Sequence, residues 1–332
     1  MSQEFSDAGT WRIAPHWKTL QMVCWASCCF GIAFGLTGCG TEQEDDQEAT
    51  ANSIDAVYVD NYPMFYFASR IGGEDVDVRF PLPSDIDPAF WEPDMDEIRE
   101  YQQARLLLFN GADYAKWAEH VSLPDRSIVR TADAFRNQWI TVADAVAHRH
   151  GPEGESHKHD GIAFTTWLDP QLAELQAEAA FEAMAKTWPE HRQAMKTRWQ
   201  ALRSDLKQLD QSLTEANVPY QHQPLIASHP VYQYLARRLD WNLQNRHWEP
   251  DQVPSDEEWA AFDELLKEHP AEIMIWEGQP TEETRMRLAD RGVTCIVYVP
   301  CGNRPKSGDD FLSVMKANVT AWNNAAQQLA AP

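Results

Sequence analysis

The sequence predicts an α/β protein with two lobes, each a mainly parallel sheet flanked by helices, joined by one long rigid helix. Short β-branched runs alternate with amphipathic stretches from residue 55 onward, and the same alternation returns after residue 220. A long apolar stripe on a single helical face separates the two parts. With 332 residues and 43% hydrophobic content, the chain has enough apolar side chains for two cores.

The first lobe is expected over residues 55–170. Its elements follow in the order strand 56–59, helix 63–71, strand 76–80, helix 94–104, strand 106–109 and a helix through Trp117. The strand Leu106-Leu107-Leu108-Phe109 is apolar throughout, which is typical of a parallel strand covered on both faces.

A helical segment is expected over residues 171–217. Pro189 suits the first turn of a helix, and large apolar residues then recur at alternating spacings of four and three: Met195, Trp199, Leu202, Leu206, Leu209 and Leu213. The run to Ala216 would be on the order of 40 Å long. An isolated coiled coil could show this stripe, but between two α/β lobes it favours a rigid spine that packs against both and restricts hinge opening.

The second lobe is expected over residues 218–332. Its strands are predicted at 225–227, 273–276 and 294–299, and its helices at 231–238, 256–267, 282–290 and the C-terminus. Cys295 and Cys301 are expected to be free thiols, because six residues of extended chain hold them roughly 20 Å apart, beyond disulfide reach.

The formal net charge of -23 attracts cations and repels phosphate backbones, so we expect no nucleic-acid partner. The sequence has no nucleophile elbow, no glycine-rich phosphate loop and no HExxH motif, so we expect no enzyme. We expect a monomer.

The N-terminus resembles a lipoprotein export signal over residues 1–38. Arg12 and Lys18 precede an apolar run that ends in Leu36-Thr37-Gly38-Cys39, which is similar to a lipobox. Cleavage before a lipidated Cys39 would leave residues 39–54 as a flexible acidic tether. The alternative is a plain anchor helix with a chance cysteine. We expect an exported lipoprotein, anchored to a membrane by lipid on Cys39 and facing the periplasm or the cell exterior.

Several short motifs carry a family resemblance. They are Tyr62-Pro63, Ile71-Gly72-Gly73, the loop 87–93, Phe109-Asn110-Gly111-Ala112, Trp167-Leu168-Asp169-Pro170, Ser228-His229-Pro230, Glu277-Gly278-Gln279-Pro280 and Val299-Pro300-Cys301-Gly302. In this order, they resemble the periplasmic binding proteins that serve zinc and manganese ABC importers. The resemblance covers about residues 54 to 330.

The resemblance implies one divalent metal between the lobes, held by four side chains from four loops. The family's ligand positions fall on Ala89, Thr165, His229 and Val299 in this sequence. Alanine and valine cannot donate to a metal, so the resemblance implies a degenerate site that does not hold zinc in the family's manner and could hold none.

Other side chains could replace the lost ligands. Glu277 follows a predicted strand, Cys301 comes two residues after Val299, and Glu92 comes three residues after Ala89. A site of His229, Glu277, Cys301 and Glu92 beside Thr165 would suit zinc or copper(I) rather than manganese. Alternatively, His229 has a structural or hydrogen-bonded role, Glu277 braces the loops and Cys301 packs as a small hydrophobic residue.

A histidine-rich loop is expected over residues 148–160, with His148, His150, His157 and His159 as weak metal ligands. Related importer proteins carry such a loop, which resembles an antenna for metal. The alternative is a solvated loop that happens to contain histidines.

Two interpretations of function follow. The first is the solute-binding protein of a metal-type ABC importer, which docks on a permease and binds zinc, with copper or manganese less favoured. The second is a lipoprotein that keeps the fold as an adhesion or interaction module, or that binds another small solute.

Overall fold

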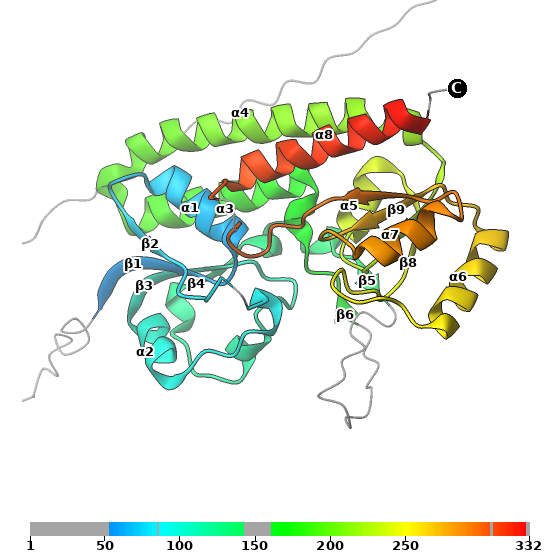
Figure 1. Ribbon diagram of the computed structural model, residues 1–332. Coiled ribbons are helices and arrows are strands. Elements are labelled where there is room, and N and C mark those ends of the chain that lie inside the picture. The colour runs from blue at the N-terminus through cyan, green and yellow to red at the C-terminus, as the bar shows by residue number, and fades with distance from the viewer. Residues whose placement is uncertain (1–52, 85, 143–160, 306–307, 330–332) are drawn as a thin grey trace, which may run out of the picture. The chain divides into compact units, whose positions relative to one another are not determined.

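The computed structural model describes residues 53–84, 86–142, 161–305 and 308–329 (Figure 1). The predicted signal, Cys39, all but the last two residues of the tether, and the histidine-rich loop with His148, His150, His157 and His159 lie outside the described residues. Within the described part of the chain, no helix has the length and apolarity that a membrane span requires.

The first sheet has four parallel strands in the order β2-β1-β3-β4. Helices α1 and α3 cover one face and α2 lies on the other (Figure 1). The bounds are β1 Ile54–Val59, α1 Tyr62–Gly72, β2 Asp77–Arg79, α2 Met95–Gln103, β3 Ala104–Phe109, β4 Ile128–Arg130 and α3 Pro170–Thr187. The buried apolar strands β1 and β3 form the centre of this lobe, as the sequence predicts.

The second sheet is also parallel, in the order β10-β9-β7-β8. Its elements are β7 Pro224–Ala227, α5 Gln233–Leu239, β8 Asn242–Asn245, α6 Asp256–Glu268, β9 Ile273–Trp276, α7 Glu282–Ala289, β10 Thr294–Val297 and α8 Phe311–Leu329. A small antiparallel pair, β5 Thr141–Val142 and β6 Gly161–Ile162, completes the strands of the described residues.

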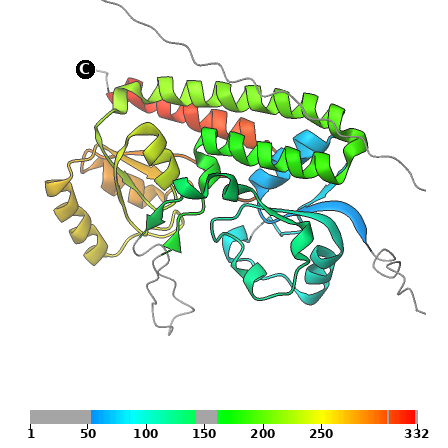
Figure 2. The ribbon, with the colours of Figure 1, turned by 180° about the vertical axis from the view of Figure 1, so that it is seen from behind.

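The predicted spine is α4, Arg192–Asn217, and the apolar stripe from Met195 to Leu213 is buried. The helix packs against α1 and α3 beside the first sheet and against α8 of the second lobe, as both views show (Figures 1 and 2). Arg70 of α1 pairs with Asp205 of α4 at 2.8 Å. Arg238 of α5 donates two hydrogen bonds, both of 2.8 Å, to Asp210 of α4. Both lobes are therefore fastened to one helix.

Two sequence predictions about local structure are wrong. The helix expected after residue 109 is only a short 3-10 turn, Lys116–Glu119, because Gly111, Ala112 and Asp113 all have positive φ. The strand expected to reach Val299 ends at Val297. The side chain of Asn318 pairs with both the N–H and the C=O of Val299, at 3.0 and 2.9 Å, in place of a neighbouring strand.

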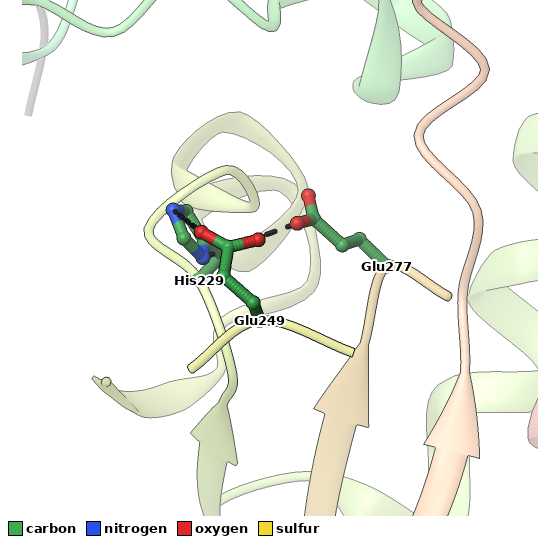
Figure 3. Close-up of side chains that lie close together, drawn as sticks. All are labelled: His229, Glu249 and Glu277. Carbon is green, nitrogen blue, oxygen red and sulfur yellow. Dashed lines mark ion pairs between the residues drawn. The ribbon is translucent and has the colours of Figure 1, made fainter. Parts of the chain in front are cut away.

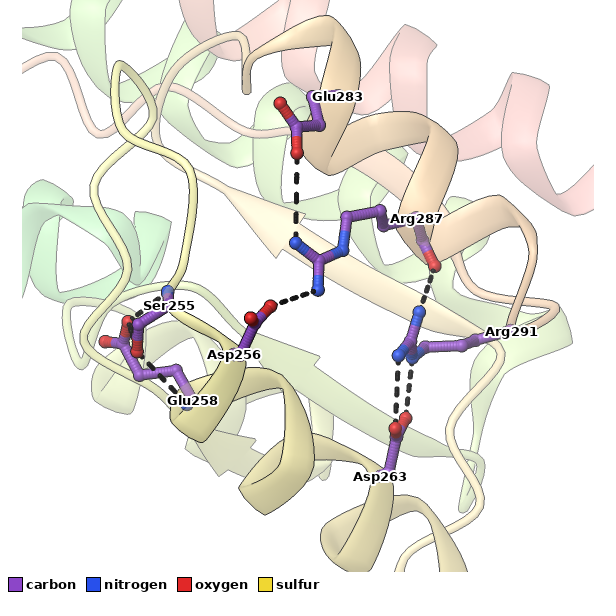
Figure 4. Close-up of polar contacts among 7 residues, drawn as sticks. All are labelled: Ser255, Asp256, Glu258, Asp263, Glu283, Arg287 and Arg291. Atoms are coloured by element: carbon purple, nitrogen blue, oxygen red, sulfur yellow. Dashed lines mark hydrogen bonds and ion pairs between the residues drawn. The ribbon is translucent and has the colours of Figure 1, made fainter.

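Helices α6 and α7 are held together by arginine–carboxylate contacts (Figure 4). Arg291 donates to both oxygens of Asp263, at 2.6 and 3.1 Å, and Arg287 lies 3.3 Å from Asp256. Ser255 and Glu258 form a capping box at the start of α6. Each exposed pair contributes little stability, but together they fix the spacing of two helices whose preceding loops enter the site described next.

Candidate metal centre

A cavity of about 600 Å³ lies where loops of the two lobes meet. The first lobe contributes the loop 87–90 and Tyr114, and the chain entering α3 contributes residues 162–165 and Trp167. The second lobe contributes the loops that follow its strands. As far as the structure describes the lining, it contains no lysine or arginine.

Three side chains of types that ligate metals converge in this cavity: His229, Glu249 and Glu277 (Figure 3). One ligand atom from each lies within 4.8 Å of the others. Nε2 of His229 is 3.8 Å from Oε1 of Glu249, and Nδ1 of His229 is 3.9 Å from Oε1 of Glu277. These separations are too long for hydrogen bonds, and they involve different ring nitrogens of His229, of which one zinc ion binds only one. Donors that share one zinc at about 2.0–2.2 Å lie about 3–4 Å apart, so a small side-chain adjustment from the 4.8 Å grouping would bring one atom of each residue to that spacing.

The sheet explains why these side chains meet. His229, Glu249 and Glu277 follow β7, β8 and β9, which are adjacent parallel strands, and ligands of parallel sheets gather beyond the carboxyl ends of their strands. Backbone hydrogen bonds tie the three loops together. Trp248 N–H donates to Ser228 O at 2.8 Å, and Thr281 N–H donates to Pro250 O at 3.0 Å.

The electrostatics of the cavity favour a cation. Burial raises the pKa of the Glu277 carboxyl; the His229 imidazole opposes this, whereas the carboxylates of Glu249 and Asp87 add to it. Burial also raises the pKa of Asp87, although the Ala89 N–H donates to its Oδ1 at 2.9 Å. Nδ1 of His229 is buried without a hydrogen-bond partner among the described residues. A divalent cation would satisfy that nitrogen and offset the carboxylates.

Three of the four positions that correspond to the family's metal ligands lie together in the structure. Ala89, Thr165 and His229 line the cavity, whereas Val299 does not and is 37% exposed. The Thr165 hydroxyl donates to Val231 O at 2.5 Å, so its hydrogen already has a partner.

Of the three side chains expected to replace the lost ligands, two line the cavity and one does not. Glu277 and Cys301 line the cavity. Burial raises the pKa of the Cys301 thiol to about 12, so it is protonated at neutral pH. Cys295 and Cys301 are free, as the sequence predicts. Glu92 is exposed and does not line the cavity, because the chain buries its neighbour Trp91 instead.

Sequence reasoning missed Glu249, His247 and Asp87 as lining residues. The His247 ring lies edge-on to His229, with centroids 5.6 Å apart. The signal that could have found Glu249 and His247 is β8, since both follow a strand adjacent to the one before His229. That strand, Asn242-Leu243-Gln244-Asn245, has no β-branched residue, so the hydrophobic pattern gave no indication of it.

A family model described as zinc-uptake complex component A, periplasmic, matches residues 57–325. The chain belongs to this family. It is 24% identical over 311 residues to the high-affinity zinc uptake system protein ZnuA of Bacillus subtilis, covering 90% of this chain and 95% of that protein. It is 23% identical over 277 residues to the zinc-binding protein AdcA of Streptococcus pyogenes, covering 78% of this chain. The match spans about half the length of that relative, 53%.

Solved structures show the same fold. The metal-dependent lipoprotein YcdH of Bacillus subtilis superposes with a TM-score of 0.68 at 20% identity, over 81% of this chain and 98% of that one. Zn(II)-bound AdcA of Streptococcus pneumoniae gives a TM-score of 0.68 at 18% identity, over 83% of this chain and 58% of that one. The predicted fold class and family resemblance are thereby confirmed.

Proposed function

We propose that this protein is the solute-binding component of a metal-type ABC importer and that it carries a zinc ion bound by His229, Glu249 and Glu277. The observation that carries the proposal is the convergence of one imidazole and two carboxylates in a cavity without lysine or arginine in its described lining. The family and the zinc-binding relatives named above support it.

The donor set favours zinc. One nitrogen and two oxygen donors suit a borderline divalent ion, and zinc binds with three protein ligands when a fourth comes from elsewhere. Manganese prefers more oxygen donors and copper(I) prefers thiolates, whereas the converging donors are one imidazole and two carboxylates, without the Cys301 thiol. Copper and manganese are therefore less favoured.

The remaining parts of the proposal concern anchoring and partners. The lipobox-like Leu36-Thr37-Gly38-Cys39 supports a lipid anchor on an exported protein, and a related metal transporter component is named a lipoprotein. The partner is an ABC permease, by analogy with the family. A module for adhesion alone has no need of three ligand loops tied to one another, so the second interpretation is not favoured.

The test is a zinc titration by isothermal calorimetry. Glu249→Gln and His229→Gln remove ligands while keeping side-chain size close to the original, and we expect each to weaken zinc binding at least tenfold, since outer-shell changes alone cost 10–100-fold. Glu92→Gln is the matched control, because it makes the same chemical change on an exposed residue outside the cavity. Equal affinities for wild type, Glu249→Gln and His229→Gln would refute the proposed site.

A further inference from the structure

We propose that the cargo of this cavity is a metal ion bound to a small amine-bearing chelator, rather than a bare ion. The inference rests on the proposed function and specifies its substrate class. Its first support is size. The cavity has a volume of about 600 Å³. A zinc ion with three waters needs about 100 Å³, since one water takes up about 30 Å³. Pockets for small organic ligands measure about 300–1,000 Å³.

The second support is an incomplete ligand set. His229, Glu249 and Glu277 all come from the second lobe, and zinc needs at least one more donor. On the opposite wall, Ala89 offers no donor, and the Thr165 hydroxyl is bonded to Val231 O. Asp87 and His247 also line the cavity, but they lie outside the group of side chains whose ligand atoms converge, and Asp87 accepts from the Ala89 N–H at 2.9 Å. The Asn303 side-chain amide donates to Pro83 O and Ile86 O, at 2.9 and 2.7 Å. A chelator that arrives with the ion would supply the missing donors.

The third support is the apolar part of the lining. Phe90, Val142, Ile162, Phe164 and Trp167 all line the cavity, and the Phe90 side chain is 54% exposed. A bare hydrated ion gains nothing from aromatic and aliphatic walls, whereas the carbon skeleton of an organic ligand packs against them. The cavity thus pairs a metal-binding wall with a wall suited to an organic molecule.

Charge defines the class of chelator. Asp87, Glu249 and Glu277 line the cavity without lysine or arginine among its described lining residues. Polycarboxylate chelates such as zinc–citrate would be repelled. A cationic chelate that carries an amine, such as the 1:1 complex of zinc with histidine, would be attracted, and its amino group would find a partner in Asp87.

Equilibrium dialysis of the purified protein tests this inference with three probes: zinc alone, zinc with radiolabelled histidine, and zinc with radiolabelled citrate. We expect one histidine to be retained per protein only when zinc is present, at least tenfold tighter zinc binding with histidine, and no retained citrate. Equally tight binding of zinc alone, without retained histidine, would overturn the inference and leave the proposed function standing. Failure of zinc to bind in any form would instead overturn the proposed function.

Two variants sharpen the test. Phe90→Ala should weaken the zinc–histidine complex two- to tenfold more than the zinc-only complex, because it removes an aromatic contact. Met95→Ala is the control, since Met95 is exposed outside the cavity. Ala89→His should restore an imidazole to the first-lobe wall, strengthen binding of zinc alone and lower histidine retention. The ratio of the affinity for the zinc–histidine complex to the affinity for zinc alone should therefore differ among wild type, Phe90→Ala and Ala89→His. An identical ratio in all three proteins would contradict the inference.

Discussion

Because the carboxyl group of Asp60 is buried, we expect its contribution to the stability of the fold to fall as pH rises. Asp60 directly follows β1, is 1% exposed, and accepts hydrogen bonds from the Asn110 N–H at 2.9 Å to each of its oxygens. Burial raises its pKa from 3.8 to about 7, against the lowering effect of the backbone hydrogen bonds and Arg130. The folded state therefore binds this proton more tightly than the unfolded state does.

The sign and size of the effect follow from linkage. A raised acid pKa means that the folded protein holds more protons between pH 4 and 7, so the contribution of Asp60 to stability declines as pH increases through that range. A shift of about three pKa units corresponds to about 4 kcal/mol at high pH, of which about 3 kcal/mol develops between pH 5 and 8. Asp60→Asn removes the titration and keeps one oxygen to accept from Asn110.

Urea unfolding of wild type and Asp60→Asn at pH 5 and pH 8 measures this effect. We expect the stability of the variant relative to wild type to increase by about 3 kcal/mol from pH 5 to pH 8. Any pH-independent cost of the substitution cancels in this comparison. The control is Asp251→Asn, which makes the same chemical change at an exposed loop position. A relative stability for Asp60→Asn that is the same at both pH values would refute the reasoning.

Three further predictions concern the core and the thiols. Gln176→Leu should lower the free energy of unfolding by about 2–4 kcal/mol, measured in urea, because the fully buried Asn110 side chain and two threonine hydroxyls each lose one of their hydrogen bonds. Leu206→Ala should cost about 2–5 kcal/mol in the same assay, because it opens a cavity in the buried stripe of the spine. Cys295 and Cys301 should react with a thiol reagent at pH 8 far more slowly in the folded than in the urea-unfolded protein, since burial raises their pKa values to about 11 and about 12. Equal rates in the folded and unfolded protein would contradict this shielding of the two thiols.

The fold could be predicted wherever the hydrophobic pattern has one structural explanation. The spacing from Met195 to Leu213 fits only one helical face, and the apolar run 273–276 is too short for a helix. The strand β8 could not be found in this way, because it lies at the edge of its sheet and alternates between exposed and half-buried residues. Its side chains do not need to be apolar.

The candidate site was only partly predictable for the same reason. His229 and Glu277 follow strands that the sequence reveals, so the strand-end rule locates them. Glu249 follows the strand that the sequence conceals, and its approach to His229 depends on the pairing of β7 with β8. Val299 shows the opposite error. A match in sequence order placed it at the site, but its backbone is bound by Asn318 and its side chain does not line the cavity.

The spine limits how the donor missing at Ala89 can be replaced. Arg70–Asp205 and Arg238–Asp210 fasten the two lobes to the same helix, whose apolar face is buried along its length. Moving the lobes together to close the gap left by Ala89 would strain these two ion pairs and the packing of the buried apolar face. With the lobes held in place, the donor missing at Ala89 must come from a new side chain on the first-lobe wall, as in Ala89→His, or from the cargo. The backbone hydrogen bonds between the loops that carry His229, Glu249 and Glu277 hold the second-lobe donors in place. The cavity is far larger than an ion, so it leaves room for a cargo that brings donors of its own.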